Sequence, residues 1–410
     1  MSVEGWKTKA LGSVAEIIMG QSPDSRYYSE EEIGLPFLQG CAEFTSKFPS
    51  AVLFCSQVKK IARTGSILFS VRAPVGRTNL TDTDYIIGRG LAALIASQIS
   101  QDYLHHYLVY SESGFRNNSQ GSTFEAINSK ELRDWAISFP EFLQEQTQIA
   151  TILSTIDRAI EQTEALIAKQ QRIKTGLMQD LLTKGIDENG NIRSEETHEF
   201  KDSPLGRIPV EWEVVTTGQV TKSLVPGRDK PDLDGGGVPW ITIPDIEGMY
   251  LDLPKSGLSL SLNAIKVANA RLMPKGTVLM SCVGEFGIAT ITECDAVANQ
   301  QLHGFICDQS ILPEWLIAQI NASGNRIDNM ATQTTIKYLN KNGCESILIT
   351  LPSLKEQVKI ISILDNINDL FEKQKKSLNK LRSLKTGLMQ DLLTGKVRVT
   401  DLLNQNTATN

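Results

Sequence analysis

The segment Lys174-Thr-Gly-Leu-Met-Gln-Asp-Leu-Leu-Thr183 returns unchanged, 211 residues later, as Lys385-Thr-Gly-Leu-Met-Gln-Asp-Leu-Leu-Thr394. At the same offset, residues 145–183 align with 356–394, and 18 of these 39 positions are identical. Ten consecutive identities do not arise from shared helical composition. The 410-residue chain therefore contains an internal duplication, and this repeat decides its organisation.

Both copies carry mostly apolar residues at alternating spacings of four and three, which is the pattern of a coiled-coil seam. At ~1.5 Å per residue, about 39 residues form a helical rod of roughly 58 Å, which cannot bury its seam alone. The simplest partner is the other copy, in a parallel or an antiparallel pairing, although ordinary core helices are an alternative. Gly176 and Gly387 allow a local bend near the C-terminal end of each helix. The predicted coiled-coil residues are Ile149, Leu153, Ile156, Ile160, Ile167, Leu177, Leu181, Ile360, Leu364, Ile367, Phe371, Leu378, Leu381, Leu388 and Leu392.

The rest of each half repeats more faintly. Gly65-Ser-Ile-Leu-Phe-Ser70 resembles Gly276-Thr-Val-Leu-Met-Ser281, and Phe139-Pro140 resembles Leu351-Pro352 just before each helical copy. Short apolar runs between glycines predict strands, and longer periodic segments predict helices. The strands are expected at 67–71, 86–87, 91–95, 278–282 and 289–291, and the helices at 103–110 and 312–320.

We therefore predict an α+β fold in which two similar domains are joined by two long helices, related by an internal pseudo-twofold repeat. The segment between the first helix and the second domain is polar and long enough to be flexible. The predicted parts are a first domain at 1–142, a helical spacer at 143–184, a linker at 185–206, a second domain at 207–354, a second helical spacer at 355–396 and a C-terminal tail at 397–410.

The charge of the chain limits what it can do alone. The net charge is −6, and residues 1–142 contain 13 basic against 15 acidic residues. Phosphate contacts require Lys or Arg, so isolated chains are expected to bind DNA weakly. The N-terminal segment lacks the apolar core of a signal peptide, and the six cysteines form no CxxC pair. These features favour a cytoplasmic protein without a zinc site or disulfide framework.

The motifs of catalysis are missing from the sequence. We find no GxxxxGK[ST] loop, no GxGxxG segment and no Asn- or Asp-Pro-Pro-aromatic segment of an amino-methyltransferase. The four histidines, at 105, 106, 198 and 303, have no evident partners and are interpreted as ordinary core or surface residues. The chain is therefore expected to be non-catalytic, with no metal or cofactor of its own, which disfavours an enzyme.

Polar clusters at loop-like positions recur at matching places in both halves. Arg and Lys can contact guanine, Asn and Gln can pair with adenine, and lysines, hydroxyls and amides also bind phosphates. The predicted DNA-binding residues are Lys59, Lys60, Arg63, Ser70, Arg72, Arg77, Arg116, Asn117, Asn118, Gln120, Ser122 and Thr123 in the first domain, and Arg228, Lys230, Ser281, Gln300, Gln301, Gln333, Thr334, Thr335 and Lys337 in the second.

Taken together, these features resemble the specificity subunits of type I restriction–modification systems, often called HsdS. The most specific marks are Ser203-Pro-Leu-Gly-Arg-Ile-Pro209 leading to Trp212, the segment 351–357 that enters the second helix, and the repeated decapeptide. Phe69-Ser-Val-Arg-Ala-Pro-Val-Gly76 and Gly121-Ser-Thr123 also look like landmarks of this family. The resemblance covers nearly the whole chain.

The resemblance implies that each variable domain is a target recognition domain for one half of a split double-stranded DNA site. It also implies an antiparallel coiled coil that docks two methyltransferase (HsdM-like) subunits, with motor-nuclease (HsdR-like) subunits completing the complex. S-adenosylmethionine, Mg and ATP are then expected on the partners. Cys282-Val-Gly-Glu-Phe-Gly287 replaces the first domain's Arg72-Ala-Pro-Val-Gly76, which predicts an asymmetric site. A type IIB-like specificity subunit and a coiled-coil scaffold without DNA binding remain alternatives.

Overall fold

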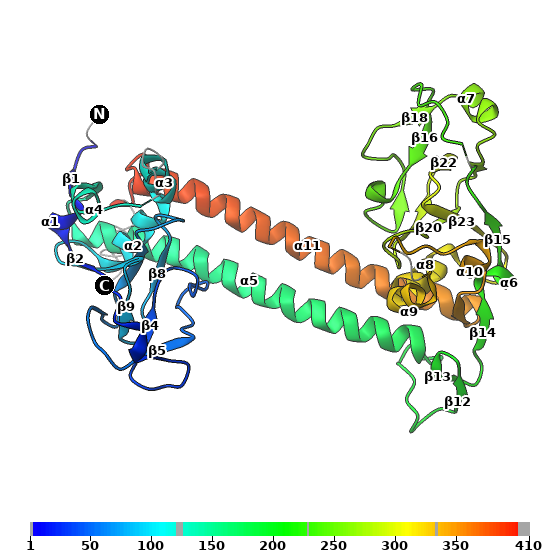
Figure 1. Cartoon of the computed structure of the whole chain (residues 1–410), viewed down its shortest axis with the longest axis horizontal. Helices are drawn as coiled ribbons and strands as arrows, with labels where there is room; N and C mark the ends of the chain where they lie inside the picture. Colours follow the sequence, from blue (N-terminus) through cyan, green and yellow to red (C-terminus); the bar gives the residue numbers. More distant parts are fainter. Residues whose placement is uncertain (1–2, 120–125, 228, 333–334, 401–410) are drawn as a thin grey trace. The chain divides into compact units, whose positions relative to one another are not determined.

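The structure, a computed structural model, describes residues 3–119, 126–227, 229–332 and 335–400 (Figure 1). The chain divides into two compact units. The first unit combines Met1–Leu166 with Lys375–Asn410, and the second is Ile167–Gln374. The two long helices cross this division, so each unit contains the beginning of one long helix and the end of the other.

Over its described residues, the first unit contains three small β-sheets and four short α-helices beside its parts of the long helices. Its sheets have the strand orders β2-β10-β7-β8, β3-β5-β4-β9-β6 and β1-β11. The strands are β1 (Trp6–Ala10), β2 (Ala15–Met19), β3 (Tyr28–Ser29), β4 (Leu35–Leu38), β5 (Leu53–Cys55), β6 (Ile61–Ala62), β7 (Ile67–Ser70), β8 (Thr78–Leu80), β9 (Tyr85–Ile87), β10 (Leu91–Ala96) and β11 (Ala136–Pro140). The helices are α1 (Leu11–Val14), α2 (Gln101–Tyr110), α3 (Glu112–Ser119) and α4 (Ser129–Asp134), with a 3-10 turn at Ser25–Tyr27.

The second unit repeats these sheets and adds one hairpin. Its sheets have the strand orders β15-β23-β20-β21-β17, β18-β16-β22-β19, β14-β24 and β12-β13. The strands are β12 (Phe200–Ser203), β13 (Gly206–Pro209), β14 (Glu213–Thr216), β15 (Thr221–Leu224), β16 (Val238–Ile241), β17 (Tyr250–Leu251), β18 (Ser259–Leu260), β19 (Leu272–Met273), β20 (Val278–Ser281), β21 (Ala289–Thr292), β22 (Ala296–Ala298), β23 (Leu302–Cys307) and β24 (Leu348–Leu351). The helices are α6 (Thr217–Val220), α7 (Leu262–Val267), α8 (Pro313–Ala322), α9 (Gly324–Met330) and α10 (Lys341–Glu345), with a 3-10 turn at Ile243–Asp245.

The duplication predicted from the sequence is visible in the strand pairing. β10 pairs with β2 and β7 in the first unit, as β23 pairs with β15 and β20 in the second, and all four pairs are antiparallel. Each unit also has a parallel pair at the same place, β4 with β9 and β16 with β22, and the second unit has a further parallel pair, β17 with β21. The predicted strands at 67–71, 86–87, 91–95, 278–282 and 289–291 correspond to β7, β9, β10, β20 and β21.

The two long helices are α5 (Leu143–Thr183) and α11 (Leu354–Leu393). Both run unbroken through Gly176 and Gly387, so neither helix is interrupted at its glycine. The side chain at every predicted seam position, from Ile149 to Leu392, is buried or half-buried. Leu166, outside the seam, is 43% exposed. The seam pattern therefore identified the sheltered face of each helix.

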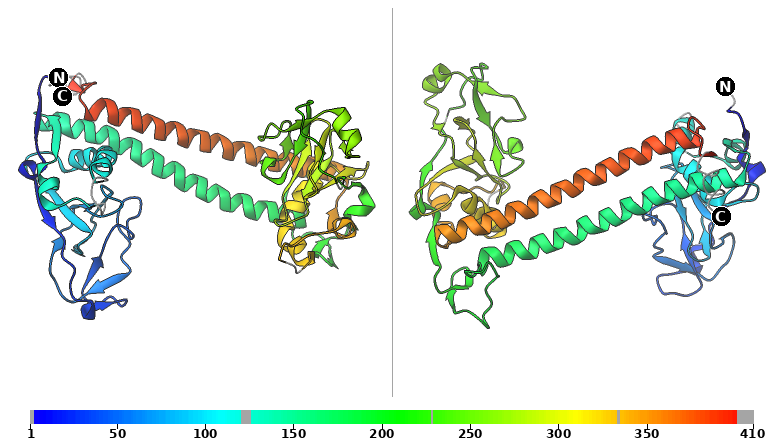
Figure 2. Two further views of the ribbon diagram at one scale, coloured as in Figure 1. Left: turned by 45° about the horizontal axis from the view of Figure 1, so that its top comes forward. Right: turned by 180° about the vertical axis from the view of Figure 1, so that it is seen from behind.

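Contacts within each unit give the helices opposite directions. In the first unit, Arg382 pairs with Glu164 (2.7 Å) and Lys385 pairs with Asp157 (2.5 Å). A later residue of α11 therefore lies beside an earlier residue of α5, which means that the two helices run in opposite directions. Both views of Figure 2 place the beginning of α5 beside the end of α11 in this unit. In the second unit, the ammonium of Lys174 lies 5.5 Å from the centre of the Phe371 ring. The sequence left parallel and antiparallel pairings open, and the structure has the antiparallel one.

A buried glutamate near the start of each long helix is bound by an arginine that follows the other helix. In the first unit, the Glu145 side chain is 1% exposed and accepts hydrogen bonds from Arg398 at 2.6 and 2.7 Å. Arg398 also donates to the carbonyl of Glu4. The strand that opens the first domain is thereby linked to both long helices of its unit.

The second unit has the same arrangement around Glu356. Its carboxylate accepts from Arg193 (2.5 Å), from the Trp212 indole N–H (3.1 Å) and from the backbone N–H of Ile186 (3.0 Å). The segment 185–206 was predicted to be a flexible linker. It is anchored at its start, where Ile186 is 2% exposed, and Phe200 begins the β12–β13 hairpin, while residues 187–206 are exposed or half-buried. Polar composition did not reveal this anchor, and the flexibility of the rest of the segment stays a prediction.

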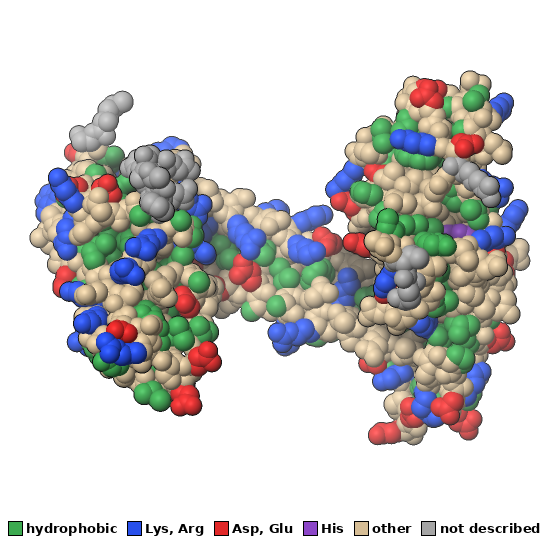
Figure 3. Space-filling view, viewed as in Figure 1, with side chains coloured by type: hydrophobic (Ala, Val, Ile, Leu, Met, Phe, Trp, Pro, Cys, Tyr) green, Lys and Arg blue, Asp and Glu red, His purple; other side chains and the backbone are tan. Residues whose placement is uncertain are grey.

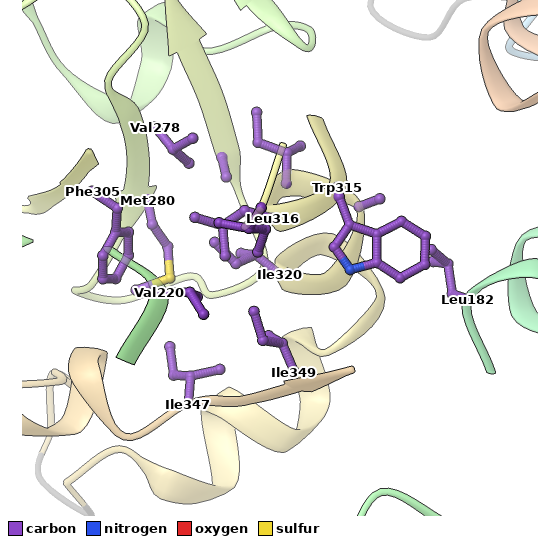
Figure 4. Close-up of a cluster of buried hydrophobic side chains, with 14 of the residues drawn as sticks. Leu182, Val220, Val278, Met280, Phe305, Trp315, Leu316, Ile320, Ile347 and Ile349 are labelled. Atoms are coloured by element: carbon purple, nitrogen blue, oxygen red, sulfur yellow. The ribbon is translucent and has the colours of Figure 1, made fainter. Parts of the chain in front are cut away.

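The core of the second unit gathers around α8. The indole of Trp315 is fully buried and donates to the carbonyl of Thr350 at 2.8 Å. It meets Trp212 edge-on, with 5.8 Å between ring centres. Figure 4 shows Leu182 from the end of α5 next to Trp315. The first unit uses Tyr103 of α2 in the same way, since its hydroxyl donates to Ser138 O at 2.9 Å.

Removing Arg193 tests the importance of the buried pair. The side chains of Arg193 and Glu356 are each 11% exposed, so Arg193→Ala leaves a carboxylate largely shielded from water. We expect it to lower the free energy of unfolding by about 3 kcal/mol, measured by denaturant unfolding at pH 7. The control is Arg207→Ala, whose two ion pairs are exposed and should change stability by less than about 1 kcal/mol. Equal effects of the two variants would contradict a special role for the buried pair.

Candidate nucleic-acid interface

Loops at one end of the sheets in the first domain enclose a polar pocket of about 370 Å³. The loop after β7 contributes Arg72, and the turn between β9 and β10 contributes Arg89. The segment after β4 contributes Gln39 and Glu43, and one carboxylate oxygen of Glu43 is buried without a hydrogen-bond partner within the described residues. Two guanidinium groups and a carboxylate at one opening are groups that can recognise the edges of base pairs.

Two predicted serines have internal roles in this framework. Ser70 is 1% exposed, and its hydroxyl donates to the carbonyl of Arg72 at 2.7 Å. Ser281 is fully buried, and its hydroxyl donates to the carbonyl of Glu285. Both hydroxyls therefore stabilise the loop that follows their strand.

A glycine at the end of the loop after β7 allows this loop to pack closely against α3. Gly76 has φ +92°, and a Cβ there would lie 3.2 Å from the carbonyl oxygen of Glu112 in α3. Gly287 of the second domain has φ +78° and meets Gly324 of α9 in the same way, at 2.8 Å. The matching of these two glycines in the sequence thus reflects the same loop-to-helix packing.

Several predicted cations are held by carboxylates. Arg63 pairs with Asp84 at 2.5 Å, Arg116 with Glu112 at 2.5 Å, and Lys337 with Asp328 at 2.6 Å. The N–H of Thr64 and then Arg63 hold the pKa of Asp84 below its ordinary value, so this carboxylate stays ionised. The ion pairs of Arg63, Arg116 and Lys337 compete with any contact that these side chains make to phosphate.

The other predicted residues fall into two groups. The exposed ones lie on loops or on α3, and they are Lys59, Lys60, Arg72, Arg77, Asn117, Lys230, Gln300, Gln301 and Thr335. Gln120, Ser122, Thr123, Arg228, Gln333, Thr334 and the side chain of Asn118 lie outside the described residues. Figure 3 shows Lys and Arg side chains on the visible face of the first domain interspersed with acidic and apolar ones. DNA contact by these residues stays a prediction.

The structure adds Arg89, Glu43 and Gln39 to the candidate interface. Sequence reasoning passed over Gly88-Arg-Gly90 because it matched no phosphate-binding motif. The available signal was a lone arginine between two glycines that separate two apolar strands, which marks a tight turn with an exposed tip.

Two of the histidines, His106 and His303, are buried within their domains. His106 is buried, and its Nε2 is 3.0 Å from the Ser154 hydroxyl; His303 contacts Ser223 in the same manner at 3.1 Å. Within the described residues, no three His, Cys, Asp or Glu side chains are grouped to hold a metal ion. All six cysteines are free thiols. Over the same residues, no helix is long and apolar enough to cross a membrane.

A family model described as the type I restriction modification DNA specificity domain matches this chain twice, at residues 3–170 and 209–383. The chain therefore belongs to this family, and the family predicted from the sequence is confirmed. The two matches follow the internal duplication, with one copy of the domain in each half.

Relatives and solved structures agree with this assignment. The putative type I restriction enzyme MjaX specificity subunit of Methanocaldococcus jannaschii is 38% identical over 187 residues, which cover 45% of this chain and 44% of that protein. The EcoDI specificity subunit of Escherichia coli is 22% identical over 412 residues, covering 96% and 88%. The crystal structure of the type I restriction–modification S subunit from M. genitalium has the same fold, with TM-score 0.59 and 16% identity over 95% and 96%. The relatives are named specificity subunits, which agrees with a non-catalytic chain.

Burial of His303 makes a testable contribution to pH-dependent stability. Desolvation lowers the pKa of His303 to about 4, whereas an unfolded histidine has a pKa near 6.5. As pH falls from about 6.5 to about 4, the unfolded state binds a proton that the folded state does not, so stability decreases. Over this pH range, we expect the free energy of unfolding of His303→Gln to fall by about 1–3 kcal/mol less than that of the wild type. Denaturant unfolding at a series of pH values measures this difference. The other buried histidines contribute equally to the pH dependence of both proteins. Parallel profiles of stability against pH would therefore contradict the contribution assigned to His303.

Proposed function

We propose that this chain is the DNA-reading subunit of a type I restriction–modification complex and that each globular domain binds one half of a split, asymmetric DNA site. The observation that carries the proposal is the repetition of one loop framework with different residues on it. The loop after β7 contains Arg72 where the loop after β20 contains Val283, although Gly76 and Gly287 close both loops alike. Two copies of one framework with different residues at equivalent positions suit two different half-sites.

The chain needs partners for strong binding and for chemistry. Its candidate interface contains several paired cations, and its net charge is −6, so phosphate contacts from other subunits would supply affinity. S-adenosylmethionine would bind to methyltransferase partners, and ATP and Mg to motor-nuclease partners. This chain would position those subunits at its DNA site.

The repeated end of each long helix supports docking of two copies of one partner. Within the identical decapeptides, Thr175 and Gln179 are exposed, as are their counterparts Thr386 and Gln390. Exposed residues do not need to stay identical for folding, whereas two docking sites for the same protein do. Just before each decapeptide, an apolar side chain is half exposed at the equivalent position: Ile173 is 53% exposed and Leu384 is 51% exposed.

A pocket beside the second repeat would contribute to such a docking surface. It has a volume of about 300 Å³ and is lined by Val109, Tyr110, Thr386, Met389 and Gln390. It therefore joins the end of α2 to the exposed side of α11 within the first unit. A partner that seats there would contact both the variable domain and the repeated helix.

Methylome sequencing tests the DNA-reading role. Cells that express the neighbouring methyltransferase should methylate a split motif with a fixed spacer when this chain is present, and should not do so without it. The two half-sites should differ in sequence, because the exposed loop residues of the two domains differ. An active methyltransferase with no motif that depends on this chain would favour a scaffold without DNA binding and would contradict the proposal.

Complex stoichiometry tests the two docking sites. Because both positions are exposed, Ile173→Glu and Leu384→Glu should leave the chain folded and place a charge where an apolar contact is expected. Each single variant should bind one methyltransferase subunit instead of two, and the double variant none, by light scattering of the co-purified complex. Leu166→Glu, exposed on α5 but farther from the identical decapeptide, is the matched control. Unchanged stoichiometry in the double variant would exclude this surface.

A further inference from the structure

One turn in each globular domain has the same backbone structure and a different residue at its tip. In the first domain, Gly88-Arg89-Gly90 joins β9 to β10, and in the second, Asn299-Gln300-Gln301 joins β22 to β23. The strand registers agree, since Leu91 after the first turn lies opposite Ser70 as Leu302 lies opposite Ser281.

Matched hydrogen bonds identify the two turns as equivalent. Each turn is hydrogen-bonded to the end of the neighbouring parallel strand, to itself and to the loop after the central strand. The pairs are Gly88 N to Leu38 O (2.8 Å) with Asn299 N to Ile241 O (2.9 Å), Leu91 N to Gly88 O (3.1 Å) with Leu302 N to Asn299 O (3.2 Å), and Val71 N to Gly90 O (3.0 Å) with Cys282 N to Gln301 O (2.9 Å). Arg89 and Gln300 therefore occupy one and the same position in the two copies.

In the first domain, the turn lies close to the segment that follows β4 and presents an arginine. A Cβ at Gly90 would lie 2.6 Å from the carbonyl oxygen of Gln39, so this close approach requires glycine. The N–H of Arg89 donates to the Ser22 hydroxyl at 3.2 Å, which fixes the tip. The Arg89 side chain is exposed and lines the polar pocket together with Arg72.

In the second domain, side chains stabilise the turn and present a glutamine. The side-chain amide of Asn299 donates to the Gln301 side chain at 3.1 Å, and its oxygen accepts from Gln301 N at 3.1 Å. Gln300 is exposed, and its amide nitrogen donates to the carbonyl of Gly227 at 3.2 Å. Gly227 follows the first strand of its sheet, as Ser22 does in the other domain, so both tips are tethered to equivalent segments.

We infer that Arg89 and Gln300 each determine one base pair of the half-site read by their own domain, a step that rests on the function proposed above. Arginine pairs bidentately with the O6 and N7 atoms of guanine, and glutamine pairs with the N6 and N7 atoms of adenine. The first half-site therefore contains a guanine read by Arg89, and the second contains an adenine read by Gln300. The backbone bonds hold the turn, while the tip residue specifies the base.

Reciprocal substitutions in the full chain, co-expressed with its methyltransferase, test this inference by methylome sequencing. Arg89→Gln should relax one guanine position of one half-site or convert it to adenine, and leave the other half-site unchanged. Gln300→Arg should do the converse in the other half-site. Methylation of duplexes substituted at that base pair should show discrimination falling by about 5-fold to 150-fold. The unchanged half-site reports that each variant is folded.

The control is Arg26→Gln, an exposed arginine of the first domain that pairs with Asp24 at 2.9 Å; its motif should equal that of the wild type. A uniform loss of methylation at all sites in Arg89→Gln would mean a phosphate contact and would overturn the inference while leaving the proposed function intact. Unchanged motifs in both variants would also overturn it. A wild-type chain that directs no split motif would overturn the proposed function and this inference with it.

Discussion

Each long helix begins with a buried carboxylate, and the arginine that neutralises it comes from the chain that leaves the other helix. A buried charge without a partner is costly, so Glu145 and Glu356 each require that the opposite helix end beside them. This condition cannot be met by a parallel pair in which both helices start at the same end. The seam supplies the apolar contact between the two long helices, and the ion pairs set their relative direction. Together they require the antiparallel pairing.

The same junctions tie the variable domains to the helices. Trp212 donates to Glu356, and its ring packs against Trp315, so one carboxylate connects a strand, the helix core and the beginning of α11. In the first unit, Arg398 bonds both Glu145 and the backbone of Glu4. Each domain is therefore oriented on its own portion of the coiled coil by buried contacts rather than by a loose connection.

Much of this architecture was predictable because it depends on periodic patterns. Seam residues such as Leu153 recur at heptad spacing, and strands such as β7 are short apolar runs bounded by glycine, so burial and element type follow from the sequence. The anchoring of the 185–206 segment could not be predicted, because it depends on Ile186 and Arg193 meeting Glu356, a residue more than 160 positions away. Arg89 was missed for a related reason, since only strand pairing brings its turn beside the loop that contains Arg72.

The equivalence of the β9–β10 and β22–β23 turns also bears on how such a protein changes over time. Main-chain bonds hold each turn, the Asn299 side chain adds to them in the second domain, and both tip side chains are exposed, where substitutions commonly cost within about 0.5 kcal/mol. Mutations at the tip are thus nearly neutral for stability, and drift can explore new side chains there without unfolding the domain. The decapeptides of the long helices differ from the turns in this respect, because they are identical in both copies. One chain thereby combines positions where its two halves have diverged with a segment where they have not.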